Sequence, residues 1–185
     1  MVGRVRRGVS RRWWWGGAAV VVAGLAGILT AVLWPSSGSV YDPPARARQY
    51  IAFSACLLTG PAGLADPSAR AVWSGMESAS SATRAKVTYL AAVGAAETVG
   101  SVTPFANSLV QQHCGLVLAV GDVEVRTTQA VAVSNEGVDF VLVGGGAAAR
   151  NVAVVPAGSA DQVSSRVASV MKGAVGGGFT PGVVS

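Results

Sequence analysis

The residues best placed to contact a ligand are polar or glycine residues in loops that directly follow apolar segments. In open α/β sheets, ligands bind just beyond the carboxyl ends of the strands. The candidate ligand-binding residues are Thr59, Gly60, Asp66, Ser68, Gly121, Asp122 and Gly144. Asp122 has a second interpretation, which we favour: aspartate is a preferred N-cap, and a helix is expected to begin there.

The sequence shows no arrangement typical of catalysis or of metal binding. His113 is the only histidine, and at the end of a predicted helix it is expected to interact with free carbonyl groups. The nine carboxylates are scattered, without a zinc-binding or paired-acid pattern, and no serine lies in a G-x-S-x-G motif. We therefore predict that the protein is not an enzyme and needs neither a metal nor a cofactor.

The glycine-rich run 144–149 follows an apolar segment and fits the pattern G-x-G-x-x-A. A dinucleotide site of this type needs a helix immediately after the glycines, so that backbone amides meet the pyrophosphate. Here an apolar strand is expected from about Asn151 instead. The run is therefore interpreted as a flexible connection.

The chain contains two cysteines, Cys56 in the first predicted strand and Cys114 just before the third. These two strands are neighbours in a doubly wound sheet, so a disulfide is a candidate in an oxidising compartment. Two buried thiols are the alternative, because cysteine is among the most buried residue types. The sequence leaves both open.

Charge is distributed unevenly along the chain. The net charge is +5, but five arginines precede the first apolar run, and the remainder carries nine basic and nine acidic residues. A neutral body with a basic tail does not resemble a phosphate-binding surface. We therefore expect no nucleic-acid partner.

The N-terminal region is typical of a membrane anchor. Residues 1–15 form a basic tail, and residues 16–34 are 19 uncharged residues bracketed by tryptophans, close to the length that spans a bilayer. The positive-inside rule places the tail in the cytoplasm and the later residues outside a single-pass cell membrane anchor. A cleaved signal peptide is the alternative. Residues 35–48 are interpreted as a linker and 176–185 as a Gly-rich tail.

Strand and helix patterns alternate between residues 49 and 175. Apolar strands and amphipathic helices in this order predict a doubly wound parallel sheet of four to five strands, covered on both faces. Asp66 and Pro67 predict a helix start, and Thr103 is expected to cap a helix that begins at Pro104. The expected strands are 51–58, 86–90, 116–120, 139–143 and 151–155, and the expected helices are 67–83, 104–113, 122–134 and 159–174.

Several segments resemble the basic membrane protein family, the solute-binding lipoproteins of ABC importers, some of which bind purine nucleosides. The resemblance is carried by residues 55–59, by Gly63 with Asp66 and Ser68, by Trp73 with Gly75, and by residues 86–90, 109–121 and 139–143. It implies the first lobe of a type I periplasmic binding protein.

The chain also departs from the family pattern. Gly60 and Ala69 stand where the family has the aspartate and the phenylalanine that help to hold a nucleoside, and the lipidated cysteine is missing. Only one of the family's two lobes is expected here. The resemblance therefore implies weak or lost nucleoside binding.

Two functions of different classes follow. The first is a membrane-anchored, extracytoplasmic solute-binding module that works with an ABC transporter permease or another envelope protein and takes a purine nucleoside or a similar small solute. The second is a structural or interaction module that docks an envelope partner and binds no small ligand. Polar groups at the strand ends favour the first function, and an apolar patch there favours the second.

Overall fold

A computed structural model describes residues 49–94 and 97–185 of the chain. The strands are β1 (Ser54–Thr59), β2 (Lys86–Ala91), β3 (Leu116–Val120), β4 (Asp139–Val143), β5 (Val152–Val155) and β6 (Gly182–Val183). The helices are α2 (Pro67–Thr83), α3 (Val99–Gln111), α4 (Asp122–Val133) and α5 (Ala160–Val175), with a 3-10 turn, η1 (Gly63–Ala65), after β1.

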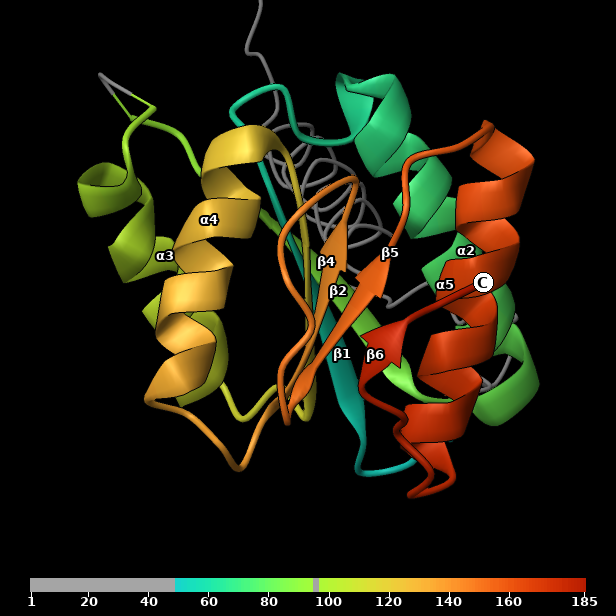
Figure 1. The fold of residues 1–185 in the computed structure, drawn as a ribbon. Coiled ribbons are helices and arrows are strands. Elements are labelled where there is room, and N and C mark those ends of the chain that lie inside the picture. The colour runs from blue at the N-terminus through green and yellow to red at the C-terminus, as the bar shows by residue number, and fades with distance from the viewer. Residues whose placement is uncertain (1–48, 95–96) are drawn as a thin grey trace, which may run out of the picture. The chain divides into compact units, whose positions relative to one another are not determined.

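The six strands form one sheet in the order β2-β1-β3-β4-β5-β6, and every neighbouring pair is parallel. Helices α2 and α5 cover one face, and α3 and α4 cover the other (Figure 1). The predicted doubly wound α/β sheet is thus confirmed. The predicted count of four to five strands was wrong, because two residues of the Gly-rich tail pair with β5 as strand β6.

Helix α2 begins and ends at the predicted residues. At its start, the Asp66 carboxylate accepts a hydrogen bond from the Ala69 amide at 2.9 Å, and Pro67 occupies the first turn, where no amide donor is needed. At its end, Arg84 adopts a left-handed conformation with φ of 63°, and its amide donates to the Ser80 carbonyl. These local interactions fix the helix next to the carboxyl end of β1.

Helix α3 begins earlier than the sequence predicted. Thr98, not Thr103, is its N-cap, and Thr98 and Ser101 form a reciprocal capping box. Thr103 instead donates its hydroxyl to the Val99 carbonyl at 2.7 Å, and Pro104 lies inside the helix. The proline removes a hydrogen bond to the carbonyl of Gly100, an exposed residue that water can reach, so the helix continues through it.

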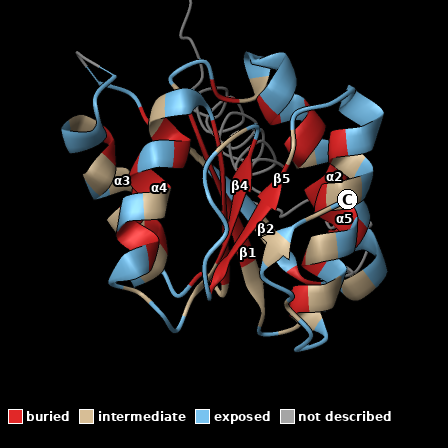
Figure 2. Cartoon of the chain, in the orientation of Figure 1, coloured by how far each residue is buried: buried red, intermediate tan, exposed pale blue. Residues whose placement is uncertain are grey.

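The core has two layers, one on each face of the sheet (Figure 2). On one side, strand residues such as Leu57 and Leu118 pack with Val72 and Met76 of α2 and Met171 of α5. On the other, the second layer is built around the fully buried Phe140 side chain. Strands buried on both faces explain the continuous apolar runs in the sequence.

The layer between α2 and α5 includes an unusually close approach of two helices. Gly75 of α2 faces the backbone of α5: an added Cβ would collide with the Ser164 carbonyl oxygen and lie 3.0 Å from the Val167 Cβ. Only a glycine leaves room for this contact. A larger residue at position 75 would therefore force α2 and α5 further apart.

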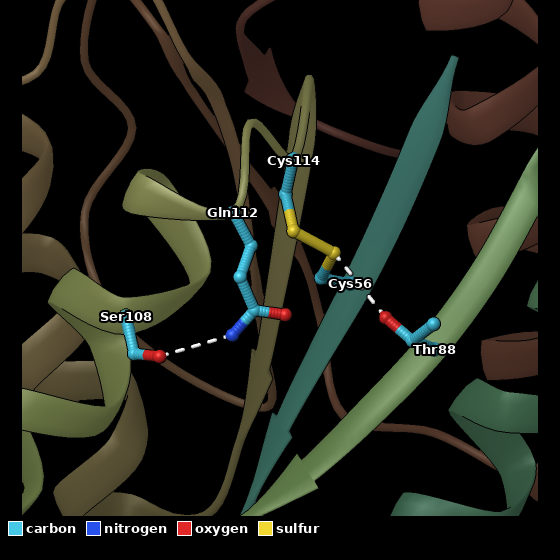
Figure 3. Close-up of a disulfide and its surroundings, with 5 residues drawn as sticks. All are labelled: Cys56, Thr88, Ser108, Gln112 and Cys114. Carbon is cyan, nitrogen blue, oxygen red and sulfur yellow. Dashed lines mark hydrogen bonds between the residues drawn. A yellow bond between two sulfur atoms is a disulfide. The ribbon is translucent and has the colours of Figure 1, made fainter. Parts of the chain in front are cut away.

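Cys56 and Cys114 form a disulfide that joins β1 to the segment between α3 and β3, two residues before β3 begins (Figure 3). Their Cα atoms are 5.9 Å apart, within the range that a disulfide spans. The Thr88 hydroxyl, on neighbouring strand β2, donates to the Cys56 sulfur at 3.4 Å. The bond joins two cysteines that are 58 residues apart in the sequence.

The predicted membrane anchor at 16–34 and the linker at 35–48 lie outside the described residues. Within residues 49–94 and 97–185, none of the helices has both the length and the apolar character that crossing a bilayer requires. The anchor therefore stays a prediction from the sequence.

Candidate functional site

The order in which strands are added to the sheet reverses at β1 and β3, which lie side by side: β2 flanks β1 on one side, and β4 flanks β3 on the other. The chain leaves β1 toward α2 on one face and leaves β3 toward α4 on the opposite face. This is the topological switch point, where open α/β sheets bind ligands. A cleft of about 900 Å³ lies there, between the loops that follow β1, β3 and β4 and the first turns of α2, α4 and α5. We call it the switch-point cleft.

The cleft brings together six of the seven residues predicted to form a site: Gly60, Asp66, Ser68, Gly121, Asp122 and Gly144. Thr59 is the exception. Its side chain is buried, and its hydroxyl donates to the Gly60 carbonyl at 3.1 Å instead of lining the cleft. Thr59 therefore supports the β1 loop rather than offering a ligand contact.

Asp122 does not cap α4, so the favoured interpretation of this residue was wrong. Gly121 is the N-cap, with φ of 114°, and Asp122 is the first helical residue, without a side-chain capping bond. The left-handed turn at Gly121 completes the strand-to-helix corner, so no side-chain cap forms there. The Asp122 carboxylate is instead exposed at the cleft.

Asp66 and Ser68 form the opposite wall, at the start of α2. One oxygen of Asp66 is used by the Ala69 amide, and both residues are exposed. Gly144, Gly145 and Gly146 line the cleft from the end of β4, and a non-helical segment leads from them to β5. The absence of a helix after these glycines agrees with their interpretation as a connection and removes the context that a dinucleotide site needs.

The most informative residue of the cleft, Glu124, was missed by the sequence analysis. It is only 3% exposed, although it lies in the first turn of α4, and its Oε1 atom has no hydrogen-bond partner among the described residues. Burial raises the pKa of Glu124, its own backbone N–H lowers it, and the carboxylates of Glu97 and Asp122 raise it further. The net effect is a pKa above the usual value of a glutamate.

Two charged residues complete the lining and were also missed. Glu97 precedes α3, and Arg126 lies one turn after Asp122, to whose carbonyl its Nε donates at 3.0 Å. No motif identifies either residue, because each reaches the cleft only through the packing of α3 and α4 on one face of the sheet. The described lining thus contains four carboxylates and one arginine.

The position of His113 gives no support for a chemical role of its side chain. It follows α3 with φ of 59°, its amide donates to the Val110 carbonyl, and it lies outside the cleft lining. Among the residues that the structure describes, His, Cys, Asp and Glu side chains form no group of three or more that could hold a metal ion.

Glu124 should make stability depend on pH. Its folded-state pKa is raised above the unfolded value of about 4.5, so the folded state binds more protons above that pH, and stability falls as pH rises through the folded pKa. Urea unfolding of the full chain should therefore show Glu124→Gln gaining stability over the wild type from pH 4 to pH 7. Burial raises the pKa of Asp139 as well, but that contribution is common to both proteins. A constant difference across this range would contradict the expectation.

Comparison with known proteins gives a likeness in fold. No protein-family model matches the chain, and no curated protein matches its sequence. The structure is similar to the crystallised fragment of a candidate lipoprotein from Peptoclostridium difficile 630, with a TM-score of 0.53 and 11% identity over 69% of this chain and 99% of that one.

Two further structures are more distant. An ABC transporter solute-binding protein from Aeropyrum pernix K1 matches with a TM-score of 0.48 and 15% identity, over 56% of this chain and 28% of that one. A transcriptional activator of the comK gene from Bacillus halodurans matches with a TM-score of 0.43 and 16% identity, over 55% of this chain and 34% of that one. These two scores are too low to support an argument. The chain thus shares a doubly wound α/β fold with the lipoprotein fragment, at an identity that speaks for fold alone.

Proposed function

We propose that the chain is a membrane-anchored, extracytoplasmic module that binds a small polar solute in the switch-point cleft and presents it to an ABC transporter permease or another envelope protein. The observation that carries the proposal is the cleft itself. Polar residues from three separate loops converge at the edge of the sheet where ligands of such folds bind. The Cys56–Cys114 disulfide supports an oxidising compartment outside the cytoplasm.

Purine nucleosides are expected to be poor ligands. Ala69, where the resemblance implies a phenylalanine, offers no aromatic face for a base, and the loss of stacking removes about 1–3 kcal/mol. An aspartate at position 60 would also stand beside the buried Glu124 carboxylate in the present site. A Cβ there would lie 3.6 Å from the Glu124 Oε1, so a second carboxylate would meet the first.

A thermal-shift screen of the full chain in detergent, with small polar solutes that include adenosine, guanosine and inosine, tests the proposal. At least one solute should raise the melting temperature saturably, and the nucleosides should bind no tighter than about 1 mM, which corresponds to about 4 kcal/mol. A bulky side chain at the wall of the cleft, Ser68→Trp, should abolish the shift. The control Ser78→Trp, on the same helix and also exposed, should preserve it.

The alternative function, an interaction module, is favoured by a different observation. Edge strand β2 leaves Tyr89 48% exposed, and Val93 just after it is 60% exposed. Large exposed apolar residues at a sheet edge are typical of a docking surface. The screen decides between the two functions. The interaction module is supported if no solute stabilises the chain, or if Ser68→Trp reduces the thermal shift no more than Ser78→Trp does.

A further inference from the structure

We propose that the switch-point cleft selects a solute carrying a protonated amine, and that the Glu124 carboxylate accepts a hydrogen bond from this ammonium group. The inference rests on the proposed solute-binding function and names the chemical class of the solute. It is carried by the position of one buried carboxylate and by the charge of the surfaces around it.

The first observation is the unpartnered oxygen of Glu124. The residue is only 3% exposed, yet it lines the cleft, and Oε1 has no hydrogen-bond partner among the described residues. Buried polar atoms are nearly always hydrogen-bonded, and a buried carboxylate without a partner is costly. The hydroxyls of Thr127 and Thr128 are also unpartnered, but neither lines the cleft. Of these three atoms, only Oε1 belongs to a residue that lines the cleft.

The second observation is the close packing of two glycines against this carboxylate. Gly60 and Gly121 lie next to it: a Cβ at position 60 would stand 3.6 Å from Oε1, and one at position 121 would collide with Oε2. Two neighbouring loops thus approach the carboxylate without a side chain. A ligand group that joins these contacts from the cleft must therefore be small, as an ammonium is.

The third observation is the excess of negative charge. Asp66, Glu97, Asp122 and Glu124 line the cleft, against Arg126 alone. The ion pair found in the described residues, Arg150 with Glu136 at 3.7 Å, lies outside the cleft. A surface of one charge sign attracts solutes of the opposite sign and rejects those of the same sign. The cleft therefore favours a cation over an anion.

A helix-stabilising role does not account for Glu124. An acidic residue in the first turn of a helix interacts favourably with the helix dipole, but exposed Asp122 already supplies this charge in the same turn of α4. The dipole interaction does not require burial. A metal ion is a poorer fit than an organic cation, because the described carboxylates do not converge in a metal-binding group.

The pKa of Glu124 gives the binding a pH signature. The groups that face the cleft are Asp66 from α2, Glu97 from before α3, and Asp122 and Arg126 from α4. Burial and the neighbouring carboxylates raise the pKa of Glu124, whereas an ammonium group beside it would lower that pKa. Binding should therefore release protons and tighten as the pH rises through the raised pKa of Glu124.

Calorimetry of the full chain in detergent with three solutes of equal length tests the proposal: 1,5-diaminopentane, 1,5-pentanediol and pentanedioate. The diamine should bind at pH 7, the diol at least about tenfold more weakly, and the dicarboxylate not measurably. Glu124→Gln should weaken diamine binding by about ten- to a hundredfold and remove its pH dependence, as expected for a hydrogen bond to a charged group. The control Glu77→Gln, an exposed glutamate in the middle of α2, should bind as the wild type does.

A second variant keeps the test decisive if Glu124→Gln fails to fold. Gly60→Ala retains the carboxylate but places a methyl group 3.6 Å from Oε1, so it should weaken diamine binding by narrowing the approach. Equal binding of diamine and diol, or equal effects of Glu124→Gln and Glu77→Gln, would overturn the proposal. If the diamine does not bind but another solute gives a shift that Ser68→Trp abolishes, the ammonium assignment fails while the solute-binding function stands. If no solute binds, both fail.

Discussion

Replacing Cys56 and Cys114 together by alanine is expected to lower the free energy of unfolding by roughly 4 kcal/mol. The disulfide closes a loop with a sequence separation of 58, and the conformational entropy it removes from the unfolded chain grows with that length. For a domain of this size the melting temperature should fall by about 15 °C. Circular dichroism melts of the full chain, wild type against the double variant, measure the change.

Two controls separate the covalent bond from the packing around it. The wild type melted in a thiol reductant should approach the double variant, because reduction removes the same constraint. Thr88→Ala loses only the hydrogen bond to the Cys56 sulfur, so its free energy of unfolding should fall by no more than about 1 kcal/mol. A double variant that melts within a few degrees of the wild type would show that the cross-link does not stabilise the domain.

Gly75→Val is expected to destabilise the domain by about 3 kcal/mol, the upper end of the usual cost of overpacking. The new side chain would meet the Ser164 carbonyl of α5, and a backbone atom cannot move aside as a flexible side chain can. The helices α2 and α5 must then separate. Chemical unfolding of the full chain measures the loss.

Ser74→Val is the matched control for this variant. It introduces the same β-branched residue one position earlier on α2, at an exposed site, and should change the stability by less than about 1 kcal/mol. Because the first turns of α2 and α5 both line the switch-point cleft, Gly75→Val should also weaken solute binding. Equal stabilities of the two variants would mean that the contact between α2 and α5 is not as tight as the geometry indicates.

The sequence was informative where local chemistry determines an element. The Asp66-Pro67 pair sets the start of α2, and the apolar runs that became β3 and β4 are each followed by a glycine with a positive φ. Six of the seven predicted site residues line one cleft, because parallel strands must end at the same edge of the sheet. The order of strands and helices alone was enough to infer that placement.

The remaining features depend on contacts that no local pattern records. Thr98 caps α3 with Ser101 as its partner, where glutamate or glutamine is the usual signal, and the proline at position 104 suggested a later start. Strand β6 is two residues long, too short for a hydrophobic period. The burial of Glu124 follows from glycines at positions 60 and 121, one of them 64 positions earlier in the chain. In the sequence, Glu124 is recognisable only as an acidic residue near the start of a helix.

The pairing of the first described helix with the last has a consequence for how the domain acquires its structure. Helix α2 packs against α5, and both contribute to the same layer of the core. Until residues 160–175 have been synthesised, α2 covers this face of the sheet alone, and the layer that contains Val72 and Met76 lacks its α5 residues. A chain of this kind cannot complete its core progressively from the N-terminus. Its early segments must remain open and protected from aggregation until α5 has emerged.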